Sequence, residues 1–172
     1  MSFVIQSEEG LAIAEIVSSH QGRGPHTGIC LSEGYMSAGG QPIPVRPVKA
    51  ADYPVYNYHK VLACLRDKAR GDRFVGDWLN GRNPDLILSD TPAGFEERVL
   101  GLVDGLIAQP GVRIVATHFE LVKLVHGLYV EDSKLGEIGD QWLPTKSGGI
   151  LLVPGLDGLV GYEYRPDLTI VE

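Results

Sequence analysis

The sequence predicts an α/β protein of the three-layer αβα class, in which helices cover both faces of a mainly parallel sheet. The prediction depends on three segments of the second half. An amphipathic helical pattern over 92–107 is followed by a β-branched apolar run at 112–116, and a second apolar helical face occupies 119–128. A buried strand between two helices is typical of a parallel sheet, because the connections between parallel strands cover its faces.

The first half predicts fewer regular elements. A strand at 11–17 leads into a glycine-rich loop over 18–28, and a helix is expected over 56–70. The segment 71–81 is expected to form a loop around Trp78. Glycine and proline are frequent between these elements, and both residues mark turns and loops. We therefore expect loops or tight turns between the elements of this half.

The second half predicts its elements in more detail. A short strand at 85–89 precedes the Thr-Pro pair at 91–92, an N-cap residue followed by proline at the first helical position. After the buried strand, Thr117 and Glu120 have the spacing of a capping box, in which each side chain bonds the backbone of the other residue. A hairpin over 149–164 completes the pattern.

Length and composition indicate one domain over residues 1–172. A chain of 172 residues with 44% hydrophobic and 22% charged residues has an ordinary globular balance and enough length for a sizeable core. No apolar run approaches the ~20 residues that a membrane helix needs. The N-terminal segment carries early acidic residues and lacks the basic start of a signal peptide. We therefore expect a cytoplasmic protein without a membrane partner.

Charge and cysteine content limit the kinds of ligand and partner that the protein can bind. The formal net charge is −7 and no basic stripe is present, which argues against nucleic acid because phosphate-backbone binding needs clustered Lys and Arg. A small anionic ligand remains compatible, since a few local donors can outweigh a mild overall charge. Cys30 and Cys64 share no metal-like spacing and predict two free thiols. We expect neither a metal nor a cofactor, and the sequence leaves a homodimer open.

His118 is the main candidate functional residue. It follows the apolar run 112–116 and opens the next helix, so we expect it beyond the C-terminal end of a parallel strand, where ligands of open α/β sheets bind. A helix N-terminus also offers free N–H groups and partial positive charge, which favour phosphate. At that place His118 can donate to a phosphate oxygen or exchange a proton. The alternative is a local hydrogen bond within the helix cap.

Three motifs support the functional interpretation by their order. Residues 115–118 (Val-Ala-Thr-His) form a strand end that precedes a helix, and residues 89–91 open a helix with an Arg-Val pair at 98–99. Upstream, Asp72 precedes 76–81 (Gly-Asp-Trp-Leu-Asn-Gly). Together these segments resemble the histidine phosphatase superfamily, also called phosphoglycerate-mutase-like. That family has Ser/Thr-His, Gly-Glu-Ser and an acid followed by Gly-x-Trp-x-Gly at these places.

The defining Arg-His-Gly motif of that family is degenerate here. The resemblance aligns His20 with the histidine that becomes phosphorylated, but Ser19 stands in place of Arg and Gln21 in place of Gly. Residues 31–34 are similar to the family's Leu-Thr-Glu-x-Gly stretch. Lys49 stands where the family has its second phosphate-binding arginine. Compared with the family, the front half is shortened, so we expect the family's first helix to be reduced or missing.

The resemblance implies a phosphomonoester hydrolase that acts through phosphohistidine on a small phosphorylated molecule. His20 would attack phosphorus, and His118 would hold the phosphoryl oxygens. Asp72 would protonate the leaving oxygen as general acid, which requires a raised pKa. The same resemblance implies a set of substrate-binding residues, of which the last two have helix capping as their alternative role: Arg23, Lys49, Asp90 and Thr91.

Two other functions are compatible with the sequence. A phosphatase fold without the motif arginine would bind a phosphorylated ligand or partner without turnover, because charge stabilisation is most of phosphoryl-transfer catalysis and Ser does not replace a bidentate Arg. Alternatively, 86–90 and 116–121 resemble segments of P-loop ATPases of the mismatch-repair type, with 22–28 as the phosphate loop. The Gly-Lys-Ser/Thr end of the P-loop consensus is absent there.

Overall fold

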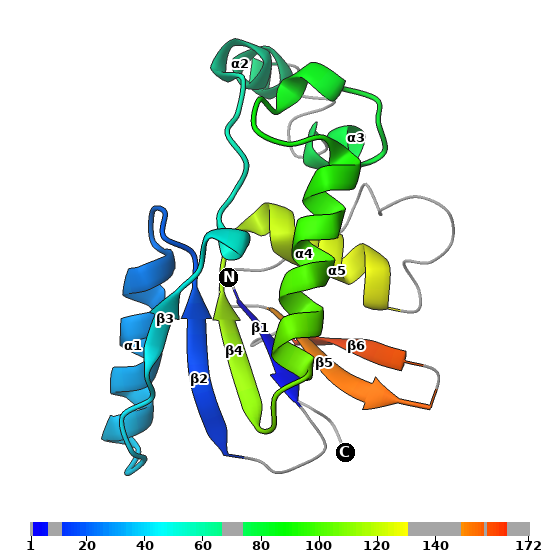
Figure 1. Cartoon of the computed structure of the whole chain (residues 1–172). Coiled ribbons are helices and arrows are strands. Elements are labelled where there is room, and N and C mark those ends of the chain that lie inside the picture. The colour runs from blue at the N-terminus through cyan, green and yellow to red at the C-terminus, as the bar shows by residue number, and fades with distance from the viewer. Residues whose placement is uncertain (1, 7–11, 67–73, 131–148, 157, 165–172) are drawn as a thin grey trace.

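The computed structural model describes residues 2–6, 12–66, 74–130, 149–156 and 158–164 (Figure 1). These residues form an α/β fold with a six-stranded sheet in the order β3-β2-β4-β1-β5-β6. The strands are β1 (Ser2–Gln6), β2 (Ile13–Ser18), β3 (Val45–Pro47), β4 (Val112–Ala116), β5 (Gly149–Gly155) and β6 (Gly158–Tyr164).

Parallel pairing is concentrated in one half of the sheet. Strand β2 pairs in parallel with β3 on one side and with β4 on the other. Strand β1 runs antiparallel to β4, and β5 and β6 form an antiparallel hairpin beside it. The described sheet thus combines a small three-stranded parallel part with a two-stranded hairpin. The candidate site lies at the parallel part, where β2 and β4 end together.

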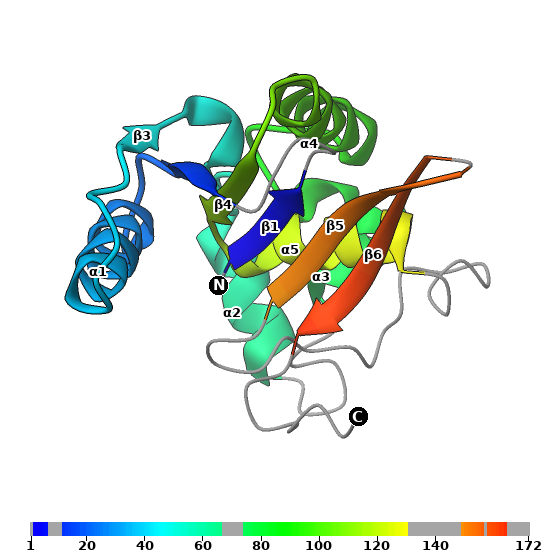
Figure 2. The ribbon, with the colours of Figure 1, turned by 90° about the horizontal axis from the view of Figure 1, so that it is seen from below.

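Helices pack on both faces of this parallel part. Helix α1 (Gly24–Ser37) approaches β2 so closely that a Cβ on Gly28 would lie 3.4 Å from the Ile16 side chain. On the other face, Val17 and Val115 belong to the main core with helices α4 (Pro92–Ile107) and α5 (Phe119–Tyr129). Figure 2 shows α1 at the β3 end of the sheet, apart from α4. The alternation of Ile16 and Val17 therefore separates two apolar layers.

Most of the elements predicted for the second half of the chain are confirmed by the structure. Strand β4 has the predicted bounds, and the hairpin forms as expected. Helix α4 begins at Pro92 after Thr91, whose side chain accepts a hydrogen bond from the Gly94 N–H at 3.1 Å. The predicted apolar face of α4 is turned into the core: Phe95, Val99, Leu102, Val103 and Leu106 are buried.

Two loop predictions in the first half are wrong. The glycine-rich segment was expected to be a loop with little helix after it, but α1 begins at Gly24 and has 14 residues. Gly24 and Gly28 lie on the side of α1 that touches β2, so their missing side chains allow close packing. The phosphate loop of the ATPase interpretation is therefore not formed at Gly24–Gly28. Within the predicted 71–81 loop, Phe74–Leu79 forms helix α3 and buries Trp78.

Other differences concern short segments. The predicted strand at 85–89 is a 3-10 turn, η2 (Pro84–Leu86), followed by one antiparallel bridge between Ile87 and Tyr56. Helix α2 (Tyr58–Arg66) agrees with the described part of its prediction. Strand β1 was not predicted, because its five residues are too few to show a clear hydrophobic periodicity.

Membrane-spanning length is not reached by any described helix. Each is too short or too polar to cross a bilayer. Cys30 and Cys64 are free thiols, as their spacing predicted.

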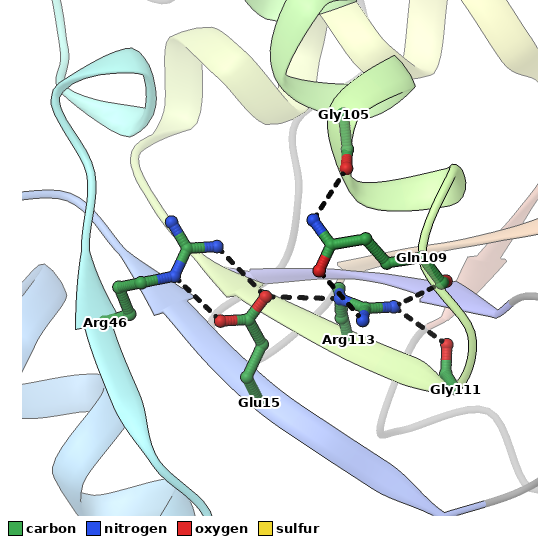
Figure 3. A network of polar contacts seen from close by, with 6 residues as sticks. All are labelled: Glu15, Arg46, Gly105, Gln109, Gly111 and Arg113. Carbon is green, nitrogen blue, oxygen red and sulfur yellow. Dashed lines mark hydrogen bonds and ion pairs between the residues drawn. The ribbon is translucent and has the colours of Figure 1, made fainter.

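A partly buried ion-pair network joins the three parallel strands at their opposite end (Figure 3). Glu15 of β2 accepts hydrogen bonds from Arg46 of β3 at 2.9 and 3.0 Å and from Arg113 of β4 at 3.2 Å. The Arg113 side chain is only 6% exposed and also donates to the carbonyl oxygen of Gln109 at 2.8 Å. Hydrogen bonds from Arg46, followed by those from Arg113, hold the pKa of Glu15 below its usual range. The network therefore fixes the register of the parallel strands electrostatically.

Candidate functional site

The candidate site forms where β2 and β4 end side by side. Ser18 is paired with Ala116, and the backbone N–H of Ser19 donates to the Ala116 carbonyl oxygen at 3.1 Å. His118 follows two residues later as the N-cap of α5, with extended backbone angles. The C-terminal edge of the parallel strands thus carries Ser19 and His118 together, as the position of His118 in the sequence predicted.

Ser19 and His118 are in direct contact. The Ser19 Oγ lies 2.7 Å from His118 Nε2, and the same hydroxyl donates to the Gln21 carbonyl oxygen at 3.0 Å. A hydroxyl has one proton, so Ser19 accepts from His118 while it donates to Gln21. This pattern assigns the proton of neutral His118 to Nε2 and leaves the lone pair on Nδ1. Ser19 is fully buried, so the accessible reactive group of the pair is His118, which is half-buried.

Two glycines permit this arrangement. Gly22 has a φ of +59°, and a Cβ there would lie 3.5 Å from His118 Cε1. A Cβ on Gly24 would lie 2.1 Å from Ser19 Oγ. The positive φ favours glycine at position 22, and the close approach to Ser19 requires a residue without a side chain at position 24.

The surroundings of His118 keep it mainly neutral. Burial lowers the pKa of His118, and the Glu120 carboxylate, a hydrogen bond with the Gln21 backbone and the Asp52 carboxylate oppose the shift only in part. The Tyr53 ring packs edge-on against the imidazole, with 4.7 Å between ring centroids. His118 therefore has an acceptor nitrogen at neutral pH and becomes a donor at both nitrogens when it gains a proton.

The predicted capping box at Thr117 and Glu120 is wrong. Thr117 Oγ1 donates to the Ala51 carbonyl oxygen at 2.8 Å, and His118 takes the N-cap position. Glu120 instead accepts a short hydrogen bond from the Tyr56 hydroxyl. Burial, with the neighbouring Glu120, raises the pKa of Tyr56, so this phenol stays protonated. Both side chains of the expected box thus bond to residues 51–56, which lie across from the start of α5.

That segment is held in place from two directions. On one side, the 3-10 turn η1 (Lys49–Ala51) accepts the Thr117 hydrogen bond through the Ala51 carbonyl oxygen. Arg98 of α4 donates to the carbonyl oxygens of Ala50 at 2.8 Å and Asp52 at 3.1 Å. Arg98 also pairs with Asp90 at 3.3 Å. These bonds position Asp52 and Tyr53 against the two histidines.

A pocket of about 430 Å³ opens beside this segment. Its size lies within the ~300–1,000 Å³ range of small-molecule sites. Both signs of charge line it, since Lys49 and Arg98 face Asp52 and Asp90. The remaining lining residues are uncharged: Gln21, Ala50, Tyr53, Val55 and Ser89. His118 does not line the pocket itself, but its imidazole contacts Tyr53, which does.

His20 likewise does not line the pocket, but it lies beside the lining residue Asp52. Its backbone N–H donates to Asp52 Oδ1 at 2.6 Å, and its ring Nδ1 is 3.5 Å from Asp52 Oδ2. The His20 side chain is 51% exposed. A carboxylate near Nδ1 favours the proton on that nitrogen and leaves the Nε2 lone pair available. The hydrogen-bond partner of His118, however, is not His20 but the preceding residue, Ser19.

The other predicted site residues do not all lie at the pocket. Lys49 and Asp90 line the pocket, whereas the Thr91 side chain caps α4, its alternative role. Arg23 is exposed at the N-cap of α1. Asp72, the predicted general acid, lies outside the described residues.

Sequence reasoning missed most of the partners that build the site. Ser19 was noted only as a replacement for the motif arginine, and Asp52 and Tyr53 lie in a proline-rich segment without periodicity. Arg98 carried a signal, because it belongs to the Arg-Val pair at 98–99 in the predicted helix. The contacts across the chain between 49–56 and 117–120 have no local signature.

Comparisons with family profiles, curated proteins and solved structures find no match for this chain. Within the part of the chain that the structure describes, no three His, Cys, Asp or Glu side chains come together as a metal-ligand group. Lys49 forms no ion pair with any described residue, whereas Arg98 is paired with Asp90.

Proposed function

We propose that this protein is a divergent phosphomonoester hydrolase of the histidine phosphatase type, in which a phosphoryl group is held between His20, His118 and Lys49. The observation that carries the proposal lies at the end of two parallel strands, where Ser19 contacts His118 and His20 contacts Asp52. Asp52 lines a pocket that also contains Lys49, which has no ion-pair partner among the described residues. The resemblance of 115–118, 89–91 and 76–81 to that superfamily adds to it.

His20 is the nucleophile of the proposed reaction. Its exposed ring has Asp52 near Nδ1, so Nε2 can attack phosphorus without further activation. The P–O bond of the ester breaks as the P–Nε2 bond forms, and the departing oxygen takes a proton. Water then attacks the phosphohistidine and releases inorganic phosphate. Asp72 remains the proposed proton donor on the resemblance alone.

His118 and Lys49 are the proposed phosphate-binding groups. Lys49 supplies a positive charge at the pocket. Neutral His118 directs Nε2–H at Ser19, so it offers phosphate a donor mainly when it is protonated and Nδ1 also carries hydrogen. A phosphate anion beside it favours that charged form. Turnover is expected to be slow, because a single lysine replaces two bidentate arginines.

A second function, phosphate-ester binding without turnover, is favoured by the charges around the pocket. Ser19 occupies the motif position of the arginine and bonds His118 instead of a ligand. Arg98 is already engaged by Asp90 and two carbonyl oxygens. Asp52 and Asp90 add negative charge, which opposes the further charge stabilisation that the transition state needs. Such a site retains affinity more easily than catalysis.

Steady-state hydrolysis of p-nitrophenyl phosphate, with inorganic phosphate as competitor, tests both functions. The hydrolase predicts slow turnover that is abolished by His20→Ala and unchanged by His59→Ala, since His59 is an exposed histidine on α2. Binding of inorganic phosphate without turnover selects the second function. Fast turnover that survives His20→Ala, or absence of phosphate binding, contradicts the proposal.

A further inference from the structure

We propose that the substrate class of this site is the aryl phosphomonoesters, with the aromatic group seated on an apolar rim formed by Val55 and Leu88. The inference rests on the proposed function, because it assigns the non-phosphate part of the same ligand. It starts from two large apolar side chains that are exposed next to a charged pocket: Val55 is 49% and Leu88 is 65% exposed.

The backbone brings these two side chains together. Tyr56 and Ile87 form an antiparallel bridge, and Leu88 N–H donates to the Val55 carbonyl oxygen at 2.7 Å. Residues 55 and 88 therefore lie opposite each other, one step from the bridge. Side chains alternate along extended segments, so Val55 and Leu88 point away from the core while Ile87 is buried.

This apolar rim continues the lining of the pocket. Val55 and Ser89 both line it, and Val55 N–H donates to Ser89 Oγ at 2.8 Å. Tyr53, two residues before Val55, lines the same pocket and touches His118. Tyr53 thus contacts both His118 and the pocket, and Val55 belongs both to the pocket lining and to the apolar rim. The charged residues Lys49 and Asp52 line the same pocket as Val55.

An aryl phosphate has the matching distribution of charge and apolar surface. Its phosphate belongs at the Lys49 and His118 end, where protonation of His118 adds a donor. Its flat ring covers Val55 and packs against Tyr53, which removes apolar surface from water on both sides. Sugar or polyol phosphates leave Val55 and Leu88 exposed and gain nothing from this wall. The charged pocket residues and the apolar rim together therefore favour aryl phosphates over sugar or polyol phosphates.

Hydrolysis-resistant phosphonates test the inference apart from catalysis. We expect the wild-type protein to bind benzylphosphonate about tenfold more tightly than methylphosphonate in calorimetric titrations, an effect of the size that burying one face of a ring gives. Val55→Ser and Leu88→Ser should each reduce this ratio to about threefold or less. Leu156→Ser is the matched control, because Leu156 is fully exposed at the turn between β5 and β6.

The possible results separate the two proposals. The aryl assignment is wrong, and the phosphate site stands, if methylphosphonate binds as tightly as benzylphosphonate. The same conclusion follows if the tighter binding of benzylphosphonate survives both rim substitutions. If neither phosphonate binds, the proposed function fails and the inference fails with it. Circular dichroism of each variant shows whether the fold is intact, and Val55 and Leu88 are exposed enough for serine to be accepted.

Discussion

Ser19 Oγ lies 2.7 Å from His118 Nε2, at the point where two parallel strands end. Because Ser19 also donates to the Gln21 carbonyl oxygen, it fixes the imidazole with the proton on Nε2. The histidine that the sequence singled out is thus oriented by a buried serine. Ser19 is a positioning residue, and its removal should change the chemistry of His118 more than the fold.

The first prediction concerns the tautomer of His118. In wild-type protein, long-range proton–nitrogen NMR spectra at neutral pH should show His118 protonated at Nε2 and unprotonated at Nδ1. Ser19→Ala removes the acceptor, so both tautomers should become populated. Ser37→Ala, which removes an exposed hydroxyl bonded within α1, should leave the His118 signals in place. A fixed Nε2–H tautomer in Ser19→Ala would disprove the role of the serine.

The second prediction is a pH dependence of anion binding. Burial lowers the pKa of His118, so the residue is mainly neutral at neutral pH and gains its proton only as the pH falls. A bound phosphonate favours the protonated form, so binding should strengthen from about pH 8 to about pH 5, by up to roughly tenfold for each unit by which the ligand raises the pKa.

The His118→Asn variant is the reference for that dependence. Ionisation of the ligand itself is the same for both proteins, so the ratio of the two affinities isolates His118. The ratio should grow as the pH falls. A ratio that is constant across the range would mean that His118 does not share a proton with the bound anion.

The third prediction compares two glycines of α1. A methyl group on Gly24 would lie 2.1 Å from Ser19 Oγ, whereas nothing lies within 4 Å of the equivalent position on Gly34. Gly24→Ala should destabilise the protein by about 2 kcal/mol in urea unfolding, because the overlap has to be relieved by a backbone or side-chain shift. Gly34→Ala should stabilise it by about 0.5 kcal/mol through helix propensity. Equal effects at both positions would contradict the close contact at Ser19.

The fourth prediction concerns Glu15. Its folded pKa is depressed, so its contribution to stability is present above the ordinary glutamate pKa and is lost as the pH falls through the lowered value. Glu15→Gln should cost about 2 kcal/mol at neutral pH, because Arg113 stays buried with fewer partners. The loss should shrink in acid. Glu33→Gln, at an exposed position of α1, should have little effect at any pH.

Local patterns explain what the sequence could predict. Helix α4, strand β4 and the hairpin each have a periodic pattern with a clear start or stop, and they form as expected. The start of α1 was missed because the glycines over 24–28 favour a loop locally. The fold uses them differently, since Gly24 and Gly28 are contact points of α1 against Ser19 and Ile16. Tertiary packing overrides propensity at this helix.

The site was predictable only in part for the same reason. His118 was found from its place after a buried strand, and Lys49 and Asp90 came from the family resemblance. Ser19 and Asp52 gained their roles from contacts between distant segments, which no periodicity encodes. The capping-box spacing of Thr117 and Glu120 was misleading, because both side chains find partners in residues 51–56.

Covalent trapping of the phosphorylated protein tests the central claim most directly. After brief reaction with p-nitrophenyl phosphate, mass spectrometry under alkaline conditions should locate an acid-labile phosphoryl group on His20. The group should be absent from His20→Ala and present in His59→Ala. Turnover without a phosphohistidine, or a phosphoryl group on any residue other than His20, would show that His20 is not the nucleophile of the reaction.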